Sequence, residues 1–219
     1  MSGLDFHPVM LKLPFLLGGV GTTMLLAGIS FALGLLLAVV LVIMRVDGRG
    51  PVKRLSVIYG TALTNTPQLS QIFALFYSLP LFGMTVSPFI SVLTGMALNA
   101  AAYLAEILAT GLRTVPHAYH DAALTLGMNR FQIWTRVLLP HAGRAMYPAL
   151  SNHFQIMILG SSMASIFGVE DLTGRAYDIG TSSFRIVEVM SVTAGLYIIL
   201  SFVLGGLLAL LHHLVERRV

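Results

Sequence analysis

Long uncharged apolar runs alternate with short segments that carry the charges. No charged residue occurs at 13–44, 55–105, 145–169 or 189–215. A helix needs about 20 mostly apolar residues to cross a bilayer. The run at 55–105 is too long for one helix, and proline and glycine at Pro80, Gly83 and Pro88 interrupt it. The pattern therefore predicts five transmembrane helices, at about 18–45, 55–78, 88–112, 145–167 and 189–215.

The composition agrees with an all-α integral membrane protein. Hydrophobic residues make up 56% of the chain and charged residues 10%, whereas soluble domains carry about 25% charged residues. We expect a single transmembrane domain over residues 1–219, without space for a separate soluble catalytic domain. The absence of cysteine excludes disulfides and thiolate metal sites. The net charge of +4 comes from basic residues at the ends of the apolar runs, so it indicates a lipid bilayer rather than nucleic acid.

The distribution of basic residues predicts the orientation. Cytoplasmic loops are enriched in Lys and Arg. With the N-terminus outside and the C-terminus in the cytoplasm, only three basic residues lie outside, namely Lys12, Arg175 and Arg185. The other ten lie inside: Arg45, Arg49, Lys53, Arg54, Arg113, Arg130, Arg136, Arg144, Arg217 and Arg218. The mixed charges of 170–188 then face outward, where this segment is a plausible docking surface for a partner.

The loop at 113–144 is predicted to contain two short helices. Pro116 suits the first turn of a helix, and Gly127 can end that helix in a left-handed conformation. Asn129 and Gln132 have the spacing of a capping box for a second helix, and Pro140 is expected to stop it before the fourth span. Such a hairpin either docks into a groove of a partner or lies amphipathically on the membrane.

The same loop carries a family resemblance. Asp121-Ala122-Ala123, Gly127 and Leu139-Pro140 resemble the EAA loop of bacterial ABC importer permeases, with aspartate in place of the usual glutamate. Shorter strings in matching order resemble the polar amino acid subfamily, which serves histidine, glutamine, arginine and opines. These strings are Asn65-Thr66-Pro67, Leu98-Asn99, 102–107, Val115-Pro116, 162–165 and Gly168-Val169. The resemblance runs from about residue 18 to residue 218.

The resemblance implies a permease of the bacterial cytoplasmic (inner) membrane that forms half of a pathway for an amino acid or a similar small polar solute. Its EAA loop would form coupling helices that sit on a dimer of ABC ATPase subunits. Further implied partners are a second permease, identical or homologous, and a periplasmic or extracellular solute-binding protein. The chain has no phosphate-binding loop, because Lys12 and Lys53 follow Leu11 and Val52 rather than glycine. ATP and Mg are therefore expected on the partner, with no cofactor on this chain.

One face of the third predicted span is polar. The residues Asn99, Tyr103, Glu106, Thr110 and Arg113 are spaced by four, three, four and three. A carboxylate in a span is costly against lipid, so Glu106 should face protein or a water-filled cavity. Glu106 thus either contacts the solute or makes a structural ion pair. Asn99 and Tyr103 are candidate pathway residues with it.

The fourth span has a second polar stripe. Asn152, Gln155 and Ser162 are candidates for contact with a solute, and Pro148 is a candidate bend. The same residue types also join helices in membranes without touching a solute. Where many members of the resembled family carry charges, this chain has the neutral Thr64, Leu159 and Gly160. Either the solute differs from a charged amino acid, or a second permease supplies the charges.

Two rival functions make different predictions. A secondary transporter or channel would use Glu106 as an ion or proton site and would need no ATP. A membrane-embedded enzyme would need a catalytic constellation, and none is recognisable. The pairs His117/His120 and His212/His213 lack a third ligand, so no metal site is expected.

Overall fold

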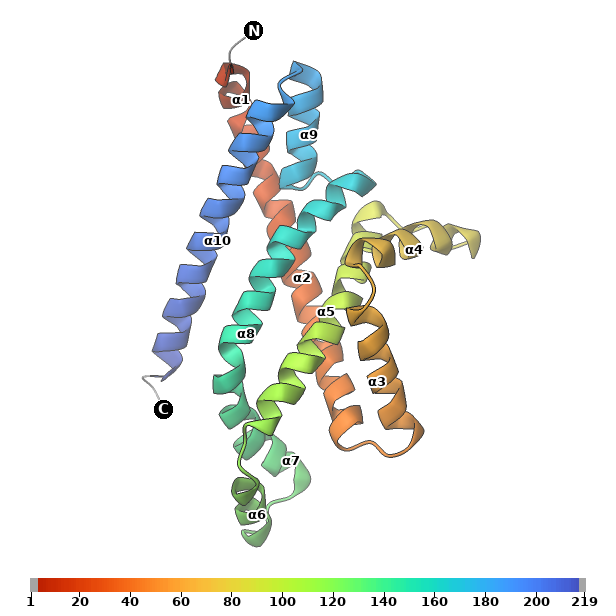
Figure 1. Ribbon diagram of the computed structural model, residues 1–219, viewed down its shortest axis with the longest axis vertical. Coiled ribbons are helices and arrows are strands. Elements are labelled where there is room, and N and C mark those ends of the chain that lie inside the picture. The colour runs from red at the N-terminus through yellow and green to blue at the C-terminus, as the bar shows by residue number, and fades with distance from the viewer. Residues whose placement is uncertain (1–3, 217–219) are drawn as a thin grey trace.

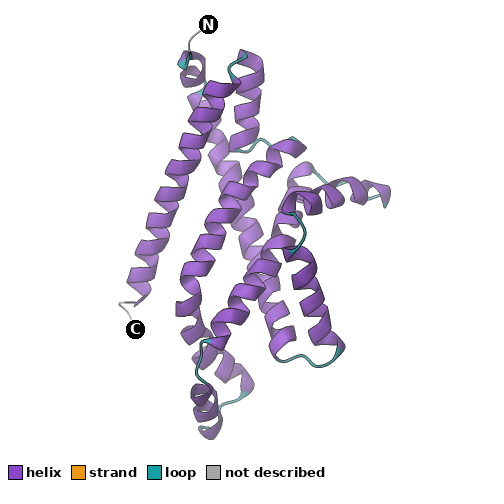
Figure 2. Ribbon diagram, viewed as in Figure 1, coloured by secondary structure: helices purple, strands orange, loops and turns teal. Residues whose placement is uncertain are grey.

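The computed structural model describes residues 4–216, and this part of the chain consists of helices and loops without strands (Figures 1 and 2). Arg217 and Arg218, two of the ten basic residues predicted to lie in the cytoplasm, are outside the described residues. The first elements are α1 (His7–Leu11), α2 (Leu13–Val46), α3 (Pro51–Thr64), α4 (Gln68–Leu81), α5 (Pro88–Arg113) and α6 (His117–Thr125). The later ones are α7 (Arg130–Ile133), a π-helical turn (Trp134–Leu138), α8 (Leu139–Gly160), a 3-10 helix (Ser161–Phe167), α9 (Leu172–Ser183) and α10 (Ile186–Glu216).

Three helices are long and apolar enough to cross a membrane. They are α2, α5 and the part of α10 from Ile186 to Leu214. They coincide with the predicted spans at 18–45, 88–112 and 189–215, although α2 begins five residues earlier, at Leu13. A fourth candidate is the stretch Arg130–Phe167 together with α9, which is bent by 47° relative to it. The described residues thus contain three or four candidate spans by length and composition.

The second predicted span, 55–78, is wrong as a continuous helix. It is divided into α3 and α4, each 14 residues long, by the segment Asn65–Pro67. Pro67 cannot donate a backbone hydrogen bond, and it restricts the residue before it to extended conformations. In Figure 1, α4 turns away from the line of α3 and projects from the side of the bundle. The break has consequences for the candidate site.

Pro140 does not stop the helix before the fourth span, contrary to expectation. Helical structure continues from α7 through the π-helical turn into α8. In that turn the N–H of Leu139 bonds to the carbonyl of Trp134, five residues back. A π-helical turn changes the local hydrogen-bond register, which allows the chain to absorb a proline that has no N–H of its own.

The centre of the molecule is the pair α2 and α5, which is packed closely through small residues. A Cβ atom on Gly34 of α2 would lie 2.8 Å from the Cβ of Ala100 on α5. Ala100, Ala101 and Ala105 are all buried in this core. Without a water-driven hydrophobic effect between lipid-embedded helices, close van der Waals contact of small residues is a main source of cohesion. The two helices therefore form a closely packed central pair, against which the neighbouring helices pack.

The segment 170–188 is a helix anchored to the bundle, and two of its acidic residues are buried. Asp171 caps α9 by accepting a hydrogen bond from the backbone N–H of Gly174 at 2.8 Å. The N–H of Leu172 donates to Thr23 of α2, and the Tyr197 hydroxyl of α10 donates to Asp171. Asp171 is 0% and Glu188 5% exposed. These two carboxylates are therefore structural, and a docking surface here can use only the remaining residues of the segment.

Candidate functional site

A cavity of about 530 Å³ lies where the break between α3 and α4 meets α5 and α8. Its lining residues are Thr64, Asn65, Thr66, Pro67, Gln68, Met96, Asn99, Ala100, Tyr103, His153, Ile156 and Met157. None of these side chains is a lysine, arginine, aspartate or glutamate. We refer to this space as the neutral cavity. Its volume is in the range of small-molecule sites, which begins at about 300 Å³.

The broken backbone is held by polar side chains of α4 and α5. The Gln71 amide donates to the carbonyls of Leu63 at 2.9 Å and Thr66 at 3.0 Å. The Asn99 amide donates to the Gln71 side chain at 3.3 Å, and the Tyr103 hydroxyl donates to the carbonyl of Thr64 at 3.3 Å. Buried backbone groups need such partners when a helix is interrupted. Asn99 and Tyr103 thus both stabilise the break and line the neutral cavity.

His153 is the residue of this cavity that the sequence reasoning missed. It is 8% exposed, and its ring stacks on that of Tyr103 with centroids 5.5 Å apart. Its Nε2 atom is buried and has no hydrogen-bond partner among the described residues. The single histidine of the uncharged run at 145–169 was the available signal, because ionisable side chains within a membrane span usually serve a function.

The stripe predicted on the fourth span was displaced by one residue from the face that meets the cavity. Asn152 is exposed and does not line the cavity, whereas its neighbour His153 does. Gln155 lies beside Gly205 of α10, 3.5 Å from where a Cβ of that glycine would be. Ser162 lies in the 3-10 helix, and its carbonyl accepts a hydrogen bond from Ser165. Of the six candidate pathway residues, only Asn99 and Tyr103 border the neutral cavity.

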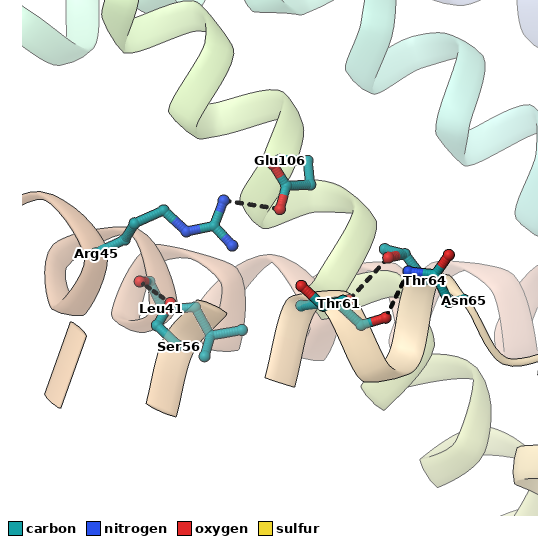
Figure 3. A network of polar contacts seen from close by, with 8 residues as sticks. Leu41, Arg45, Ser56, Thr61, Thr64, Asn65 and Glu106 are labelled. Carbon is teal, nitrogen blue, oxygen red and sulfur yellow. Dashed lines mark hydrogen bonds and ion pairs between the residues drawn. The ribbon is translucent and has the colours of Figure 1, made fainter. Parts of the chain in front are cut away.

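Glu106 forms an ion pair with Arg45 of α2. Arg45 Nη1 lies 2.7 Å from Glu106 Oε1, as Figure 3 shows, and both side chains lie against Gly60 of α3. A Cβ on Gly60 would lie 2.9 Å from Arg45 Nη2, so the pair occupies space that only glycine leaves free. In the same view, Ser56 of α3 donates to the carbonyl of Leu41 on α2 at 2.7 Å. Glu106 therefore joins three helices and does not face the neutral cavity.

A second cavity, of about 510 Å³, opens beside this ion pair between α2, α3 and α5. Its lining contains Arg45, Lys53, Arg113, His117 and the single carboxylate of Glu106. We refer to it as the basic cavity. Thr110, the remaining residue of the α5 stripe, borders a smaller space of about 270 Å³ between α5 and α8, together with Glu106.

The loop at 113–144, which we call the coupling loop after its predicted role, has the predicted helix–glycine–helix form. Gly127 adopts φ = 71°, a left-handed conformation that favours glycine. Asn129 accepts from the N–H of Gln132, and Gln132 accepts from the N–H of Asn129, both at 2.9 Å, so the capping box is present. Leu126 is 79% and Phe131 76% exposed. The loop therefore presents apolar side chains away from the bundle.

The predicted coupling residues divide into an exposed and a buried group. Asp121, Ala122, Gly127, Leu139 and Pro140 are exposed, whereas Ala123 is buried against the molecule. Two contacts outside this set link the loop to the long helices. Arg130 makes an ion pair with Asp47 beyond the end of α2, and Tyr119 packs edge-on against His141 of α8 at 5.2 Å. The loop is thus connected to α2 and α8 as well as to α5.

No group of three or more metal-ligating side chains occurs within residues 4–216. Outside the proposed spans, burial raises the pKa of Asp171 to about 6, although hydrogen bonds from Gly174 and Tyr197 act in the opposite direction. This group lies at the start of α9 and does not line any of the three cavities described above.

Comparison with known proteins places these features in a family. Residues 30–219 match the family described as "Binding-protein-dependent transport system inner membrane component". The chain is 35% identical to the L-cystine transport system permease protein TcyB of Bacillus subtilis (strain 168), over 94% of this chain and 86% of the relative. It is 35% identical to the octopine transport system permease protein OccM of Rhizobium radiobacter, over 95% and 89%.

Solved structures agree with this relationship. A chain from the crystal structure of an amino acid ABC transporter with histidines superposes with a TM-score of 0.89 at 28% identity, covering both chains completely. The MetNI methionine ABC transporter in an inward-facing form shares the fold, with a TM-score of 0.76 at 19% identity over 98% of this chain and 99% of that one. These matches also exclude the rival functions of a secondary transporter and an enzyme. The chain belongs to the family of inner membrane components of binding-protein-dependent transport systems, and it is a membrane permease subunit of an ABC importer.

Proposed function

We propose that this permease imports an amino acid or a closely related zwitterion, and that the neutral cavity is its solute site. The observation that carries the proposal is the cavity at the helix break, with Asn99, Tyr103 and His153 on its wall. The relatives named above serve L-cystine and octopine, and a further relative, the glutamine permease GlnP of Escherichia coli (strain K12), is 27% identical over 98% of this chain. These solutes share an ammonium group and a carboxylate on one carbon atom.

The broken helix is suited to a zwitterion. The last carbonyls of α3 and the first N–H groups of α4 both lie at the break, with Thr64 and Gln68 on the cavity wall. Helix C-termini attract cations and helix N-termini attract anions. Interrupted helices in transporters use these ends to hold solutes near the middle of the membrane. The ammonium group is held on the α3 side and the carboxylate on the α4 side, without charged side chains.

We place the N-terminus outside and the C-terminus in the cytoplasm, with α3 and α4 together making the second of five spans. The basic residues support this orientation, since Arg45, Arg49, Lys53 and Arg54 cluster at the junction of α2 and α3. Arg113 and Arg130 flank α6 at the same end of the molecule, as Figure 1 shows for these elements. The neutral cavity then lies within the membrane, and the coupling loop lies in the cytoplasm.

The coupling loop is the proposed contact with the ATPase. The exposed Asp121-Ala122 edge of α6 and the apolar side chains of Leu126 and Phe131 form a surface for a cleft on that partner. When the ATPase dimer closes, the loop moves as a unit because the Gly127 turn, the capping box and the contacts to α2 and α8 hold it together. The movement reaches the neutral cavity along α5, which connects the loop to Tyr103 and Asn99.

In this mechanism two permeases, identical or homologous, enclose the pathway, and a solute-binding protein delivers the solute to the outer face. The remaining exposed residues of 170–188 are the proposed docking surface, with Tyr177 at 50% and Phe184 at 93% exposure. ATP and Mg are used by the partner and not by this chain. Alternating access then exposes the neutral cavity first to the outside and afterwards to the cytoplasm.

The proposal is tested with the complete complex in liposomes, with its own binding protein and ATP inside. Uptake of labelled L-cystine, L-glutamine, L-histidine and L-arginine is measured with ATP and with a non-hydrolysable analogue. We expect ATP-dependent uptake of at least one of these zwitterions, and loss of uptake for Asn99→Ala. Uptake of only non-zwitterionic solutes, such as sugars or inorganic ions, would refute the proposed substrate class.

A further inference from the structure

The polar stripe of α5 continues past the neutral cavity into the basic cavity. Tyr103 borders the first cavity, and Glu106, three residues further along, borders the second. On α3, Thr64 borders the neutral cavity, and Thr61, three residues earlier, borders the basic cavity. Residues three apart in a helix lie on one face about one turn apart. The two cavities are therefore consecutive spaces along one groove between α3 and α5.

The basic cavity contains more positive charge than the protein neutralises. Arg45, Lys53 and Arg113 line it together with one carboxylate, that of Glu106. Only Arg45 is paired with that carboxylate, and its Nε atom is buried with no hydrogen-bond partner in the described part of the chain. Lys53 and Arg113 are exposed at this concavity, and like charges grouped around a concave surface concentrate the field and attract anions. A cavity of about 510 Å³ has room for a small organic molecule.

The arrangement suits a molecule that carries both charges. Lys53 and Arg113 offer hydrogen bonds to a carboxylate. The Glu106 side chain is 50% exposed and engages Arg45 through Oε1, so its surface is open to an ammonium group. A simple anion such as phosphate has no positive group that could pair with the Glu106 carboxylate. A zwitterionic amino acid matches the positive and the negative groups together.

We propose that the basic cavity is a second solute station, which receives the amino acid after it leaves the neutral cavity. Lys53 and Arg113 bind its α-carboxylate, and Glu106 lies beside its α-ammonium group. This inference rests on the proposed function and orientation, which place the basic cavity at the cytoplasmic end of the pathway. The neutral cavity selects the solute through hydrogen bonds, and the basic cavity draws it toward the cytoplasm by charge.

The station has a regulatory consequence. Solute that has accumulated in the cytoplasm reaches the basic cavity from inside and occupies it. An occupied station blocks release from the neutral cavity, so import slows as the internal concentration rises. The concentration of internal solute that halves import is therefore a measure of binding at the station, independent of binding to the external solute-binding protein.

The test uses the complete complex in liposomes preloaded with increasing concentrations of an unlabelled amino acid, chosen as whichever of L-cystine, L-glutamine, L-histidine and L-arginine the complex imports. Import of the same amino acid in labelled form is then measured. The double variant Lys53→Gln, Arg113→Gln removes both cations. We expect it to raise the half-inhibiting internal concentration about tenfold or more, since a tenfold change corresponds to one modest charge-assisted interaction. The external half-saturation concentration is measured alongside for both proteins, so that the internal half-inhibiting concentration is compared at the same degree of external saturation. Lys53→Arg with Arg113→Lys retains both charges and is expected to keep the inhibition.

Two controls separate binding from general damage. Arg54→Gln removes a cation from the next position of α3, which is exposed but does not line the cavity, and it is expected to leave inhibition unchanged. The decarboxylated counterpart of the imported amino acid lacks the α-carboxylate, so when preloaded it is expected not to inhibit. The counterparts are histamine for L-histidine, agmatine for L-arginine, cystamine for L-cystine and 4-aminobutanamide for L-glutamine. The station is refuted if the decarboxylated amines inhibit equally, if the glutamine double variant is inhibited like the wild type, or if import proceeds without internal inhibition. Absence of ATP-driven uptake of any zwitterion would instead refute the proposed function, and the station with it.

Discussion

At the residue scale, His153 and Glu106 border different cavities: His153 lines the neutral cavity, and Glu106 lines the basic cavity. Glu106 was predicted either to contact the solute or to make a structural ion pair, and it is paired with Arg45 at 2.7 Å and lies outside the neutral cavity. His153 was not among the candidates predicted from the sequence, yet its buried Nε2 atom, beside the neutral cavity, has no hydrogen-bond partner among the described residues. Burial without a partner costs free energy unless a ligand or water supplies the missing hydrogen bond.

Replacing His153 with phenylalanine tests its role directly. His153→Phe keeps an aromatic ring against Tyr103 but removes the nitrogen, so we expect complex formation to persist and ATP-driven uptake to fall about tenfold or more, as for loss of one hydrogen bond of about 1.4 kcal/mol. The matched control is His212→Phe, since His212 also stacks on a tyrosine, Tyr147, but far from the cavity. Equal uptake by both variants would show that His153 acts only in packing.

The Arg45–Glu106 pair makes a different prediction, which concerns stability. Glu106→Gln leaves the largely buried Arg45 without its counter-charge. We expect the free energy of unfolding to fall by roughly 1 kcal/mol, because Glu106 itself is half exposed, and the thermal midpoint of the complex to fall with it. In Arg45→Met, Glu106→Gln both charges are absent, and most of the loss is expected to be recovered. Additive effects of the two single changes in this double-mutant cycle would show that the residues do not interact.

At the scale of elements, two short segments control how the long helices act. The Gly127 turn sets the shape of the coupling loop through its positive φ, and Asp171 sets the start of α9 through its cap on Gly174. Each lies between two helices, so a change at either position should alter the direction of a whole helix.

Gly127→Val is expected to uncouple ATP hydrolysis from transport. A β-branched residue at φ = 71° costs about 1–2 kcal/mol or more, so the two halves of the loop will change their relative angle. We predict that ATPase activity of the reconstituted complex persists while uptake falls at least tenfold. Gly143→Val is the comparison, because a Cβ there also meets open space but the residue has ordinary helical geometry. If Gly127→Val transports normally, the turn does not transmit force.

The buried cap of α9 predicts a pH effect. Burial raises the pKa of Asp171 from 3.8 to about 6, so ionisation of this group opposes folding. Its favourable contribution is complete below pH 3.8 and is lost as the pH rises through about 6. Asp171→Asn keeps the capping oxygen but does not titrate. We therefore expect the thermal midpoint of the wild-type complex, relative to that of Asp171→Asn, to rise as the pH is lowered from 7 to 4.5. A constant difference between the two proteins would mean that Asp171 titrates normally.

At the scale of the whole molecule, the proposed topology places the α2–α3 junction and the α4–α5 junction on opposite faces of the membrane. The chain has no cysteine, so single cysteines at Val46 and Ser87 can be labelled without background. We predict that a membrane-impermeant maleimide labels Ser87→Cys in intact cells, and Val46→Cys only after the membrane is opened. Both positions are exposed, which makes them accessible to the reagent. Labelling of both from outside would show that α3 and α4 do not cross together.

The sequence by itself determined the features that depend on neighbouring residues. Hydropathy was sufficient for α2, α5 and α10, because an apolar run of that length has few alternatives to a spanning helix. Local spacing was sufficient for the Gly127 turn and for the capping box of Asn129 and Gln132, since a cap is completed within one helical turn.

Only the tertiary structure decided the features that depend on distant partners. Pro67 interrupts the helix locally, but the geometry of the break at Asn65–Pro67 is held by Asn99 and Tyr103, more than 30 residues away. His153 faces the cavity, rather than Asn152, because packing against α5 sets the rotation of α8. An apolar span tolerates any rotation and many bends in isolation. The hydrogen bonds and close contacts of its neighbours select one of them.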